Sequence, residues 1–291
     1  MNEFENTMTV VNSVQSTVYG DLRSIPQVAL TSTSDLRLEN TFHRRIPFNG
    51  LLTNKLLAGL PGSDFARLLP HLEPVSLAAN ESLYAFGECI SFAYFPETAV
   101  ITHLYLLEDG STTAATIIGK DGMIGLSTIF KSPAPLYATQ ITIAGSAMRI
   151  DMEVLKEEFA RGKALQQVVL NYASARIAQL SQKAVCNGRH RLDERLFTWL
   201  LMVQDRAGDD HLRLTHEQLA HYLGARRAGI TDACNALREK GAINYHRGMI
   251  RILDRQMLEA AACGCYATFK QMGQLTNTPS FMIRKADAGI G

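Results

Sequence analysis

A small set of basic, hydroxyl and amide side chains is spaced as residues that contact nucleic acid commonly are. Arg226 and Arg227 lie side by side, Thr231 and Asn235 follow at intervals of four residues, and Arg247 lies in a later Arg-Gly pair. Arginine pairs with phosphate oxygens and with the guanine edge, and asparagine pairs with adenine. These residue types therefore predict contact with double-stranded DNA, provided that the fold brings them to one surface.

Two short helices joined at a glycine are predicted to position these residues. Thr215 and Gln218 have the spacing of a capping box, so a helix begins there, and Gly224 supplies a sharp turn. A second helix is expected from about residue 226 to 240, with Gly241 as its stop. The positions expected to face inward, with Ala220 as the small residue where the helices cross, are typical of a helix-turn-helix: Leu219, Ala220, Tyr222, Leu223, Ile230, Ala233 and Leu237.

A β-hairpin is predicted directly after this motif. Residues 242–246 and 249–253 read as two strands around the Arg247-Gly248 turn, which completes a winged helix-turn-helix. Residues 187–256 hold 12 Lys and Arg against 9 Asp and Glu, a net charge of +3, whereas the whole chain carries +1. DNA binding must therefore use a local basic patch, and the positive end of the second helix adds to it.

The remainder of the 291-residue chain predicts an α+β fold with several parts. The segment 1–45 is rich in Asn, Ser and Thr and is expected to be a flexible tail. Short alternating runs separated by turn residues predict an antiparallel β-roll within 50–150. Linker and dimerisation helices are expected over 151–187, the DNA-binding domain over 188–260, and a C-terminal tail over 261–291.

The linker segment is predicted to contain one short and one long helix. Asp151 is a good N-cap for a helix that ends near Gly162. A helix of about 24 residues then spans roughly 163–187, and it carries an apolar stripe that must be buried. The stripe either packs on its own domains or pairs with a second copy of the chain, and the sequence leaves both possibilities open.

Other classes of site are weakly supported by the sequence. The pair His216-Glu217 lacks a histidine four residues on, so it is not a metalloprotease motif. Cys263 and Cys265 read as ordinary thiols, Cys234 as a packing residue rather than a redox switch, and His103 as a half-buried histidine rather than a metal ligand. We therefore expect no metal ligand and no bound cofactor.

The cellular setting is also constrained. No apolar stretch reaches the roughly 18 residues that a membrane span needs, and the N-terminus lacks the pattern of a signal peptide. The five cysteines are few and scattered, which fits a reducing cytoplasm and not a disulfide framework. A cytoplasmic protein with no membrane partner is expected.

The order of these parts resembles the Crp/Fnr family of bacterial transcription regulators. The strings FGECISFAYF and GKDGMIGLSTIF in the roll, and LTHEQLAHYLGARRAGITDACNALREKGAINYHRGMIRILD near the C-terminus, carry the resemblance over about residues 50–265. It implies a cyclic-nucleotide-binding-like roll, a homodimer joined along the long helix, a second motif helix that enters the major groove, and RNA polymerase as a partner.

Several positions depart from the family pattern. The Gly-Glu pair of the cyclic-nucleotide-binding members falls on Gly125-Leu126, and their Arg-Ser pair falls near Pro135-Leu136. Neither Leu126 nor Pro135 can replace the ribose and phosphate partners, so cyclic AMP is not expected to bind and the effector is unknown. The iron–sulfur members use cysteines near the N-terminus, whereas the first cysteine here is Cys89.

The DNA-reading positions differ as well. Ala228 and Asp232 stand beside Arg227 where nucleotide-responsive members have Glu and a second Arg, so a different target sequence is expected. Asp232 either accepts a hydrogen bond from a cytosine amino group or faces solvent.

The sequence therefore favours a dimeric, non-enzymatic DNA-binding transcription regulator. One alternative is a small-ligand sensor module that regulates a partner protein, although the exposed Arg226, Arg227, Thr231 and Asn235 argue against it. Another is an enzyme built on the roll, for which the sequence offers no convergent catalytic groups.

Overall fold

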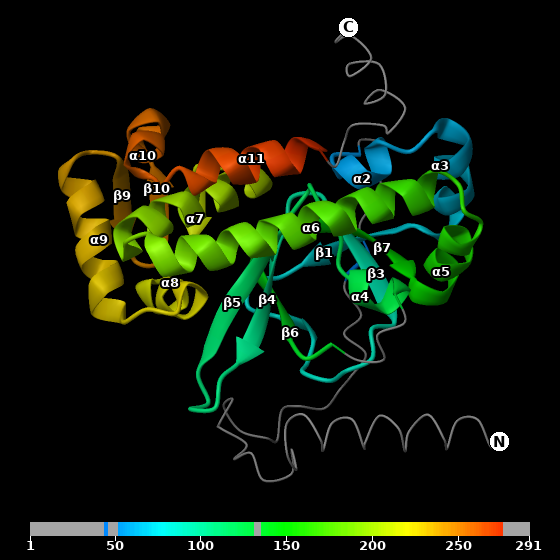
Figure 1. The fold of residues 1–291 in the computed structure, drawn as a ribbon, viewed down its shortest axis with the longest axis horizontal. Helices are drawn as coiled ribbons and strands as arrows, with labels where there is room; N and C mark the ends of the chain where they lie inside the picture. The colour runs from blue at the N-terminus through cyan, green and yellow to red at the C-terminus, as the bar shows by residue number, and fades with distance from the viewer. Residues whose placement is uncertain (1–43, 46–51, 131–134, 276–291) are drawn as a thin grey trace, which may run out of the picture. The chain divides into compact units, whose positions relative to one another are not determined.

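The computed structural model describes residues 44–45, 52–130 and 135–275 (Figure 1). Apart from residues 44 and 45, the predicted tail at 1–45 lies outside the described residues. The described chain opens with three short helices: α2 (Lys55–Ala58), α3 (Gly62–Leu68) and the 3-10 helix η2 (Leu69–His71). The Asn54 side chain begins α2 by accepting hydrogen bonds from the backbone N–H groups of Leu56 and Leu57.

Seven strands then form two antiparallel sheets, as expected for the roll. They are β1 (Glu73–Leu77), β2 (Ser82–Tyr84), β3 (Phe92–Pro96), β4 (Val100–Leu106), β5 (Thr112–Ile118), β6 (Ala138–Ile143) and β7 (Gly145–Asp151). One sheet has the order β1-β7-β3 and the other β2-β6-β4-β5. On β4, His103 lies opposite Thr116 of β5 and Thr139 of β6. The alternating apolar residues of both sheets supply a core that includes Val75, Phe95, Ile101 and Ile141.

Three helices lie within the roll sequence or directly after it. The helix α4 (Leu126–Ile129) lies between β5 and β6, and α5 (Met152–Ala160) follows β7. Asp151 is the N-cap of α5 and accepts hydrogen bonds from the N–H groups of Glu153 and Val154, as its sequence position predicts. The long helix α6 (Ala164–Arg189) has 26 residues. It includes Gly188 and so runs two residues beyond the predicted end near residue 187; His190 is the first residue with extended backbone.

The C-terminal half contains the predicted helices and hairpin. Helix α7 (Leu192–Ala207) is followed by β8 (His211–Arg213), α8 (His216–Leu223), α9 (Arg227–Glu239), β9 (Ile243–His246) and β10 (Met249–Ile252). The strand order is β8-β10-β9, so β8 adds a third strand that the sequence pattern does not reveal. Trp199 of α7 is buried and stacks on Tyr222 of α8 with ring centroids 5.3 Å apart.

Two further helices follow the hairpin. They are α10 (Arg255–Ala261) and α11 (Cys265–Leu275), and α11 lies along α6 and also contacts α7 (Figure 1). The sequence places 261–291 in a C-terminal tail, but residues 265–275 are helical. Tyr266 and Phe269 are buried, so this segment has apolar surface to bury against the rest of the chain.

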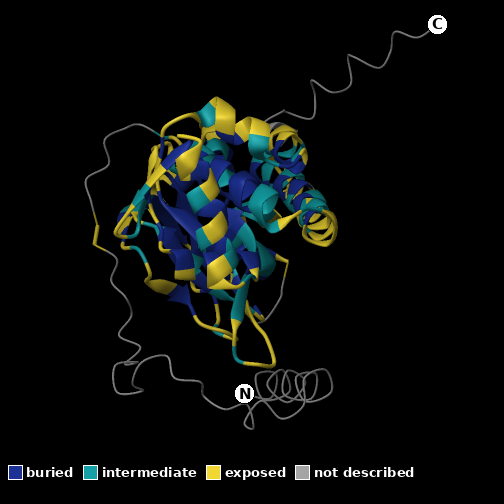
Figure 2. Cartoon of the chain, turned by 90° about the vertical axis from the view of Figure 1, so that its left-hand side faces the viewer, coloured by how far each residue is buried: buried dark blue, intermediate teal, exposed yellow. Residues whose placement is uncertain are grey.

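A second core joins the C-terminal helices to one sheet of the roll. Val100, Leu104 and Ala114 of β4 and β5 belong to the same buried cluster as the apolar faces of α7, α8 and α9. The helices accordingly show buried and exposed positions side by side along their length (Figure 2). Among the described residues, no helix is both long and apolar enough to cross a membrane.

Candidate nucleic-acid interface

The two helices of the motif meet at a tight turn. The Thr215 hydroxyl accepts a hydrogen bond from the Gln218 N–H at 3.2 Å, and the Gln218 side chain accepts one from the Thr215 N–H at 2.9 Å. This reciprocal pair begins α8 as the capping box predicts. Gly224 ends α8 with a φ of 58°, in the left-handed region that favours glycine. Ala220, Ile230 and Leu237 are buried between the helices, so the predicted inward face is correct.

The start of α9 carries two exposed arginines. Arg226 is the N-cap residue and Arg227 is the first residue of the helix. The arginine side chain has no hydrogen-bond acceptor, so Arg226 leaves the first N–H groups of α9 uncapped and available to an anion. The Arg227 Nε lies 3.8 Å from the Glu217 Oε2 of α8, and the Arg227 side chain is 71% exposed. The sequence does not predict this contact, and the Glu217 carboxylate is a competing partner for Arg227.

Thr231 and Asn235 lie further along α9. Asn235 is partly exposed. The Thr231 hydroxyl donates a hydrogen bond to the Arg227 carbonyl at 3.0 Å and is 3.0 Å from the His216 Nδ1. His216 is also stacked on Tyr245 of β9, with ring centroids 4.1 Å apart. Burial first, and then the Arg227 charge, lowers the pKa of His216.

The wing turn brings a third arginine to the surface. Arg247 and Gly248 form a two-residue turn between β9 and β10, with φ values of 46° and 76°. Positive φ at both positions is the signature of a type I′ hairpin turn. Arg247 is exposed. The expected basic residues thus lie at two points, the start of α9 and the tip of the wing.

The two roll positions on which the family's nucleotide-binding pattern falls hold apolar groups. Gly125 is the N-cap of α4, and Leu126 is partly buried against the main core. Pro135 is buried, and its carbonyl accepts a hydrogen bond from the Gly87 N–H at 2.9 Å. The ribose and phosphate partners of the family pattern therefore have no equivalent at these two positions.

His103 lies in the roll among buried polar groups of the neighbouring strands, an arrangement that the sequence does not predict. Its ring stacks on Tyr137 at 4.0 Å, and its Nε2 has no hydrogen-bond partner among the described residues. Thr116 and Thr139, its cross-strand neighbours, likewise have buried hydroxyls without a described partner. Burial, and secondly the Arg176 charge, lowers the pKa of His103 to about 3, so the ring is neutral at physiological pH.

The cysteine predictions have different outcomes. Cys234 of α9 is buried in the second core. Burial raises its pKa to about 11, which suits a packing residue and not a reactive thiol. The sequence around Cys263 and Cys265 shows no further metal-binding residue, but in the structure Cys186 and His190 lie beside them. The i, i+4 spacing of Cys186 and His190 at the end of one helix was the available signal.

Comparisons with known proteins agree with this architecture. Residues 194–261 match the family model of the Crp-like helix-turn-helix domain. Over 215 residues the chain is 24% identical to the CRP-like cAMP-activated global transcriptional regulator of Mycobacterium tuberculosis (strain ATCC 25618 / H37Rv), covering 71% of this chain and 96% of the relative.

Two solved structures share the fold at low sequence identity. FixK2 from Bradyrhizobium japonicum aligns with a TM-score of 0.56 and 20% identity, covering 66% of this chain and 98% of that one. The c-di-GMP responsive global regulator CLP from Xanthomonas campestris aligns with a TM-score of 0.52 and 13% identity, covering 66% and 99%. The chain therefore contains a Crp-like helix-turn-helix domain at residues 194–261, and over most of its length it is similar to a CRP-like transcriptional regulator.

Proposed function

We propose that the protein binds operator DNA as a homodimer, with α9 in the major groove and the wing on the backbone. The observation that carries this proposal is the pair of exposed arginines at the N-terminal end of α9. Arg227 reads a guanine in each half-site, while Arg226 and Arg247 contact phosphates. Thr231 and Asn235 lie further along the same helix, where they meet neighbouring base edges.

A second apolar face of α6 supports the homodimer. The buried face, with Leu165, Val169 and Tyr172, packs on the chain itself. Leu170, Ile177, Leu180 and Val185 are 43%, 67%, 43% and 55% exposed and lie on one face of the helix, where they form an exposed apolar surface. Small residues fill the same exposed face between them, and none of the set is charged: Ala173, Ser174, Ser181, Ala184 and Gly188. Such a face on a long helix suits antiparallel or parallel pairing with a second α6.

The signal that controls binding is a molecule other than cyclic AMP. Leu126 and Pro135 support this part of the proposal, because neither can accept from a ribose hydroxyl or pair with a cyclic phosphate. The named relatives respond to different nucleotides, cAMP for the Mycobacterium tuberculosis regulator and c-di-GMP for the Xanthomonas campestris one. A change of effector is therefore compatible with this fold.

The wider setting follows from the proposed activity. The protein acts in the cytoplasm, where it regulates transcription through contact with RNA polymerase and without a catalytic step. The alternative of a sensor module for a partner protein is disfavoured, because residues 194–261 match a DNA-binding family model.

Selection from random duplexes tests the proposed DNA contacts. Two half-sites about 34 Å apart, one helical turn, are expected for a two-fold dimer. Arg227→Ala should lose the preference at one symmetric base position per half-site, because a bidentate arginine–guanine pair contributes about 1–3 kcal/mol of discrimination. Arg226→Ala should lower affinity without changing the selected sequence. An unchanged sequence preference in Arg227→Ala would refute the assigned role of this residue.

The wing contact has its own measurement. Arg247→Ala should weaken binding to all duplexes about equally and reduce the dependence of log K on log salt by about 0.9, the value for one phosphate contact. Binding that does not depend on salt would contradict the whole proposed interface.

A further inference from the structure

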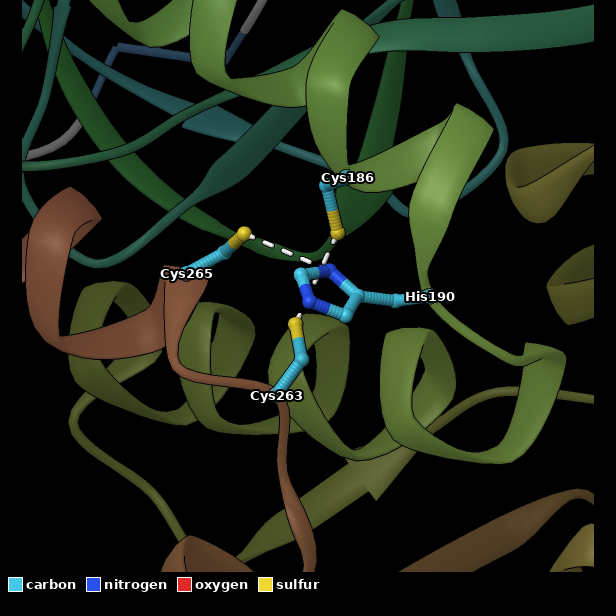
Figure 3. A group of neighbouring side chains, drawn as sticks. All are labelled: Cys186, His190, Cys263 and Cys265. Atoms are coloured by element: carbon cyan, nitrogen blue, oxygen red, sulfur yellow. Dashed lines mark hydrogen bonds between the residues drawn. The ribbon is translucent and has the colours of Figure 1, made fainter.

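Four side chains that commonly bind metal ions converge where the end of α6 meets the start of α11. Cys186 lies in the last turn of α6 and His190 just after it, while Cys263 and Cys265 lie in the link between α10 and α11 and at the start of α11. One ligand atom from each residue lies within 4.8 Å of the others. The three sulfur atoms and the imidazole point toward a common centre (Figure 3).

Two distances within this cluster match those between the ligands of one tetrahedrally coordinated ion. The Cys186 and Cys263 Sγ atoms are 3.6 Å apart, and the Cys265 Sγ is 3.5 Å from the His190 Nδ1. With Zn–S bonds of about 2.3 Å and Zn–N bonds of about 2.0 Å, the edges of a tetrahedron are about 3.8 Å between sulfurs and about 3.5 Å between sulfur and nitrogen. A disulfide needs sulfurs about 2.05 Å apart, so this spacing is not that of a bonded pair.

The environment of the cluster is also that of a structural metal site. Cys186, Cys263 and Cys265 are 2%, 5% and 4% exposed, and His190 is partly buried. Four protein ligands leave no position for a reacting water molecule, and a three-thiolate, one-imidazole set is among the common structural zinc sites.

Neighbouring polar groups are placed to support bound sulfur atoms. The Gln182 Nε2 donates a hydrogen bond to the Cys265 Sγ at 3.0 Å, and the Thr198 Oγ1 lies 3.0 Å from the Cys263 Sγ. Lys183 lies within electrostatic range of all three cysteines. A zinc ion with three thiolates carries a net charge of −1, which the Lys183 ammonium would balance. Hydrogen bonds and charges of this kind orient the ligands of a metal site and tune its affinity.

We propose that Cys186, His190, Cys263 and Cys265 bind one Zn²⁺ ion in a closed structural site. The ion joins the end of α6 to the start of α11, and so links the two ends of the segment that contains α7, the helix-turn-helix and the wing. Because the ligands come from segments more than 70 residues apart in the sequence, binding would stabilise the folded state specifically. The site does not depend on the DNA contacts proposed above.

Metal analysis of the full-length protein is the first test. The protein is purified without a histidine tag, under reducing conditions, and its metals are measured by atomic mass spectrometry. One zinc per chain is expected. Substitution with Co²⁺ should give the intense visible absorption of a tetrahedral, thiolate-bound ion. Absence of zinc from the isolated protein, together with failure to bind added Zn²⁺ or Co²⁺, would overturn the proposal, as would iron with acid-labile sulfide in place of zinc.

Variants separate the proposed ligands from the other thiols. Cys263→Ser and Cys265→Ser should lower bound zinc at least tenfold, whereas Cys89→Ser and Cys234→Ser, which change cysteines outside the cluster, should retain one zinc per chain. Gln182→Leu should weaken zinc affinity by about 10- to 100-fold, the usual effect of losing a group that supports a ligand.

A ligand exchange keeps the proposal testable if the serine variants fail to fold. His190→Cys retains four ligands, so it should bind one Co²⁺ with a stronger charge-transfer absorption from the added thiolate, while His190→Ala should bind it more weakly. Identical Co²⁺ spectra for wild type and His190→Cys would show that His190 is not a ligand and would overturn the site as drawn.

Discussion

The His216 imidazole and the Thr231 hydroxyl lie 3.0 Å apart and join the two helices of the DNA-binding motif. The hydroxyl already donates to the Arg227 carbonyl, so the His216 Nδ1–H must be the donor to it. The imidazole therefore carries a proton on Nδ1, and burial, followed by the Arg227 charge, lowers its pKa. Through its stack on Tyr245, the same ring also reaches the wing. His216 thus connects α8, α9 and β9.

The hydroxyl and the methyl group of Thr231 should have separable roles. Thr231→Val removes the hydrogen bonds and keeps a methyl group, so it should lower the free energy of unfolding by about 1 kcal/mol while retaining base preference. Thr231→Ser keeps the hydroxyl and removes the methyl group. It should therefore retain the stability of the wild type and discriminate less well for thymine, if the methyl group contacts the thymine C5-methyl. Chemical denaturation and duplex selection measure the two effects. Loss of base preference in Thr231→Val alone would contradict this division.

Glu217 is expected to restrain DNA binding. Its carboxylate is 3.8 Å from the Arg227 Nε and 3.4 Å from the His221 Nε2, and all three side chains are largely exposed. Glu217→Gln should free Arg227 and remove a negative charge near the DNA, raising affinity by up to about fivefold at low salt, the range of an exposed ion pair. Fluorescence anisotropy with a labelled duplex measures it. Glu239→Gln, at the far end of α9, is the control; an equal gain there would point to net charge alone.

The features that the sequence predicted are those with local signals. Thr215, Gln218 and Gly224 lie within ten residues and define where α8 begins and ends, and the Arg247-Gly248 pair defines the hairpin. The pairing of His216 with Thr231 depends on how two helices cross, which the residue spacing does not fix. The cluster around Cys263 depends on contact with α6, a segment more than 70 residues away. The i, i+4 spacing of Cys186 and His190 therefore indicates one half of the cluster, and no local pattern shows that Cys263 and Cys265 complete it.

The exposed face of α6 should hold the dimer together. Ile177 is 67% exposed at its centre. Ile177→Glu places a charge in a face that must lose water on pairing, so the dissociation constant of the dimer should rise at least tenfold, measured by sedimentation equilibrium. Ile177→Val retains an apolar side chain and should remain dimeric. A wild-type protein that is monomeric at micromolar concentration would contradict the proposed pairing.

Cyclic nucleotides should not bind in the family's usual mode. Leu126 and Pro135 provide neither a carboxylate nor a cation, so titration calorimetry with cyclic AMP and cyclic GMP should detect no binding at micromolar concentrations. The Mycobacterium tuberculosis regulator, which is described as cAMP-activated, is the positive control. A micromolar dissociation constant for either nucleotide would require a binding mode through other residues, such as the polar group around His103.

His103 should make the stability of the roll depend on pH. Burial and then the Arg176 charge lower its pKa from 6.5 to about 3, so between these values the unfolded chain holds a proton that the folded chain does not. Stability is therefore complete above pH 6.5 and falls as the pH is lowered toward 3, by up to about 1.4 kcal/mol per pH unit from this group. Replacing the imidazole by a neutral amide in His103→Gln should flatten this part of the profile, because the unfolded variant gains no proton there. Urea unfolding at pH 7.5, 6.5 and 5.5, values on both sides of about 6.5, measures the difference. His71→Gln, at an exposed position, should retain the wild-type slope, and a His103→Gln profile parallel to wild type would show that the imidazole gains its proton within the folded roll.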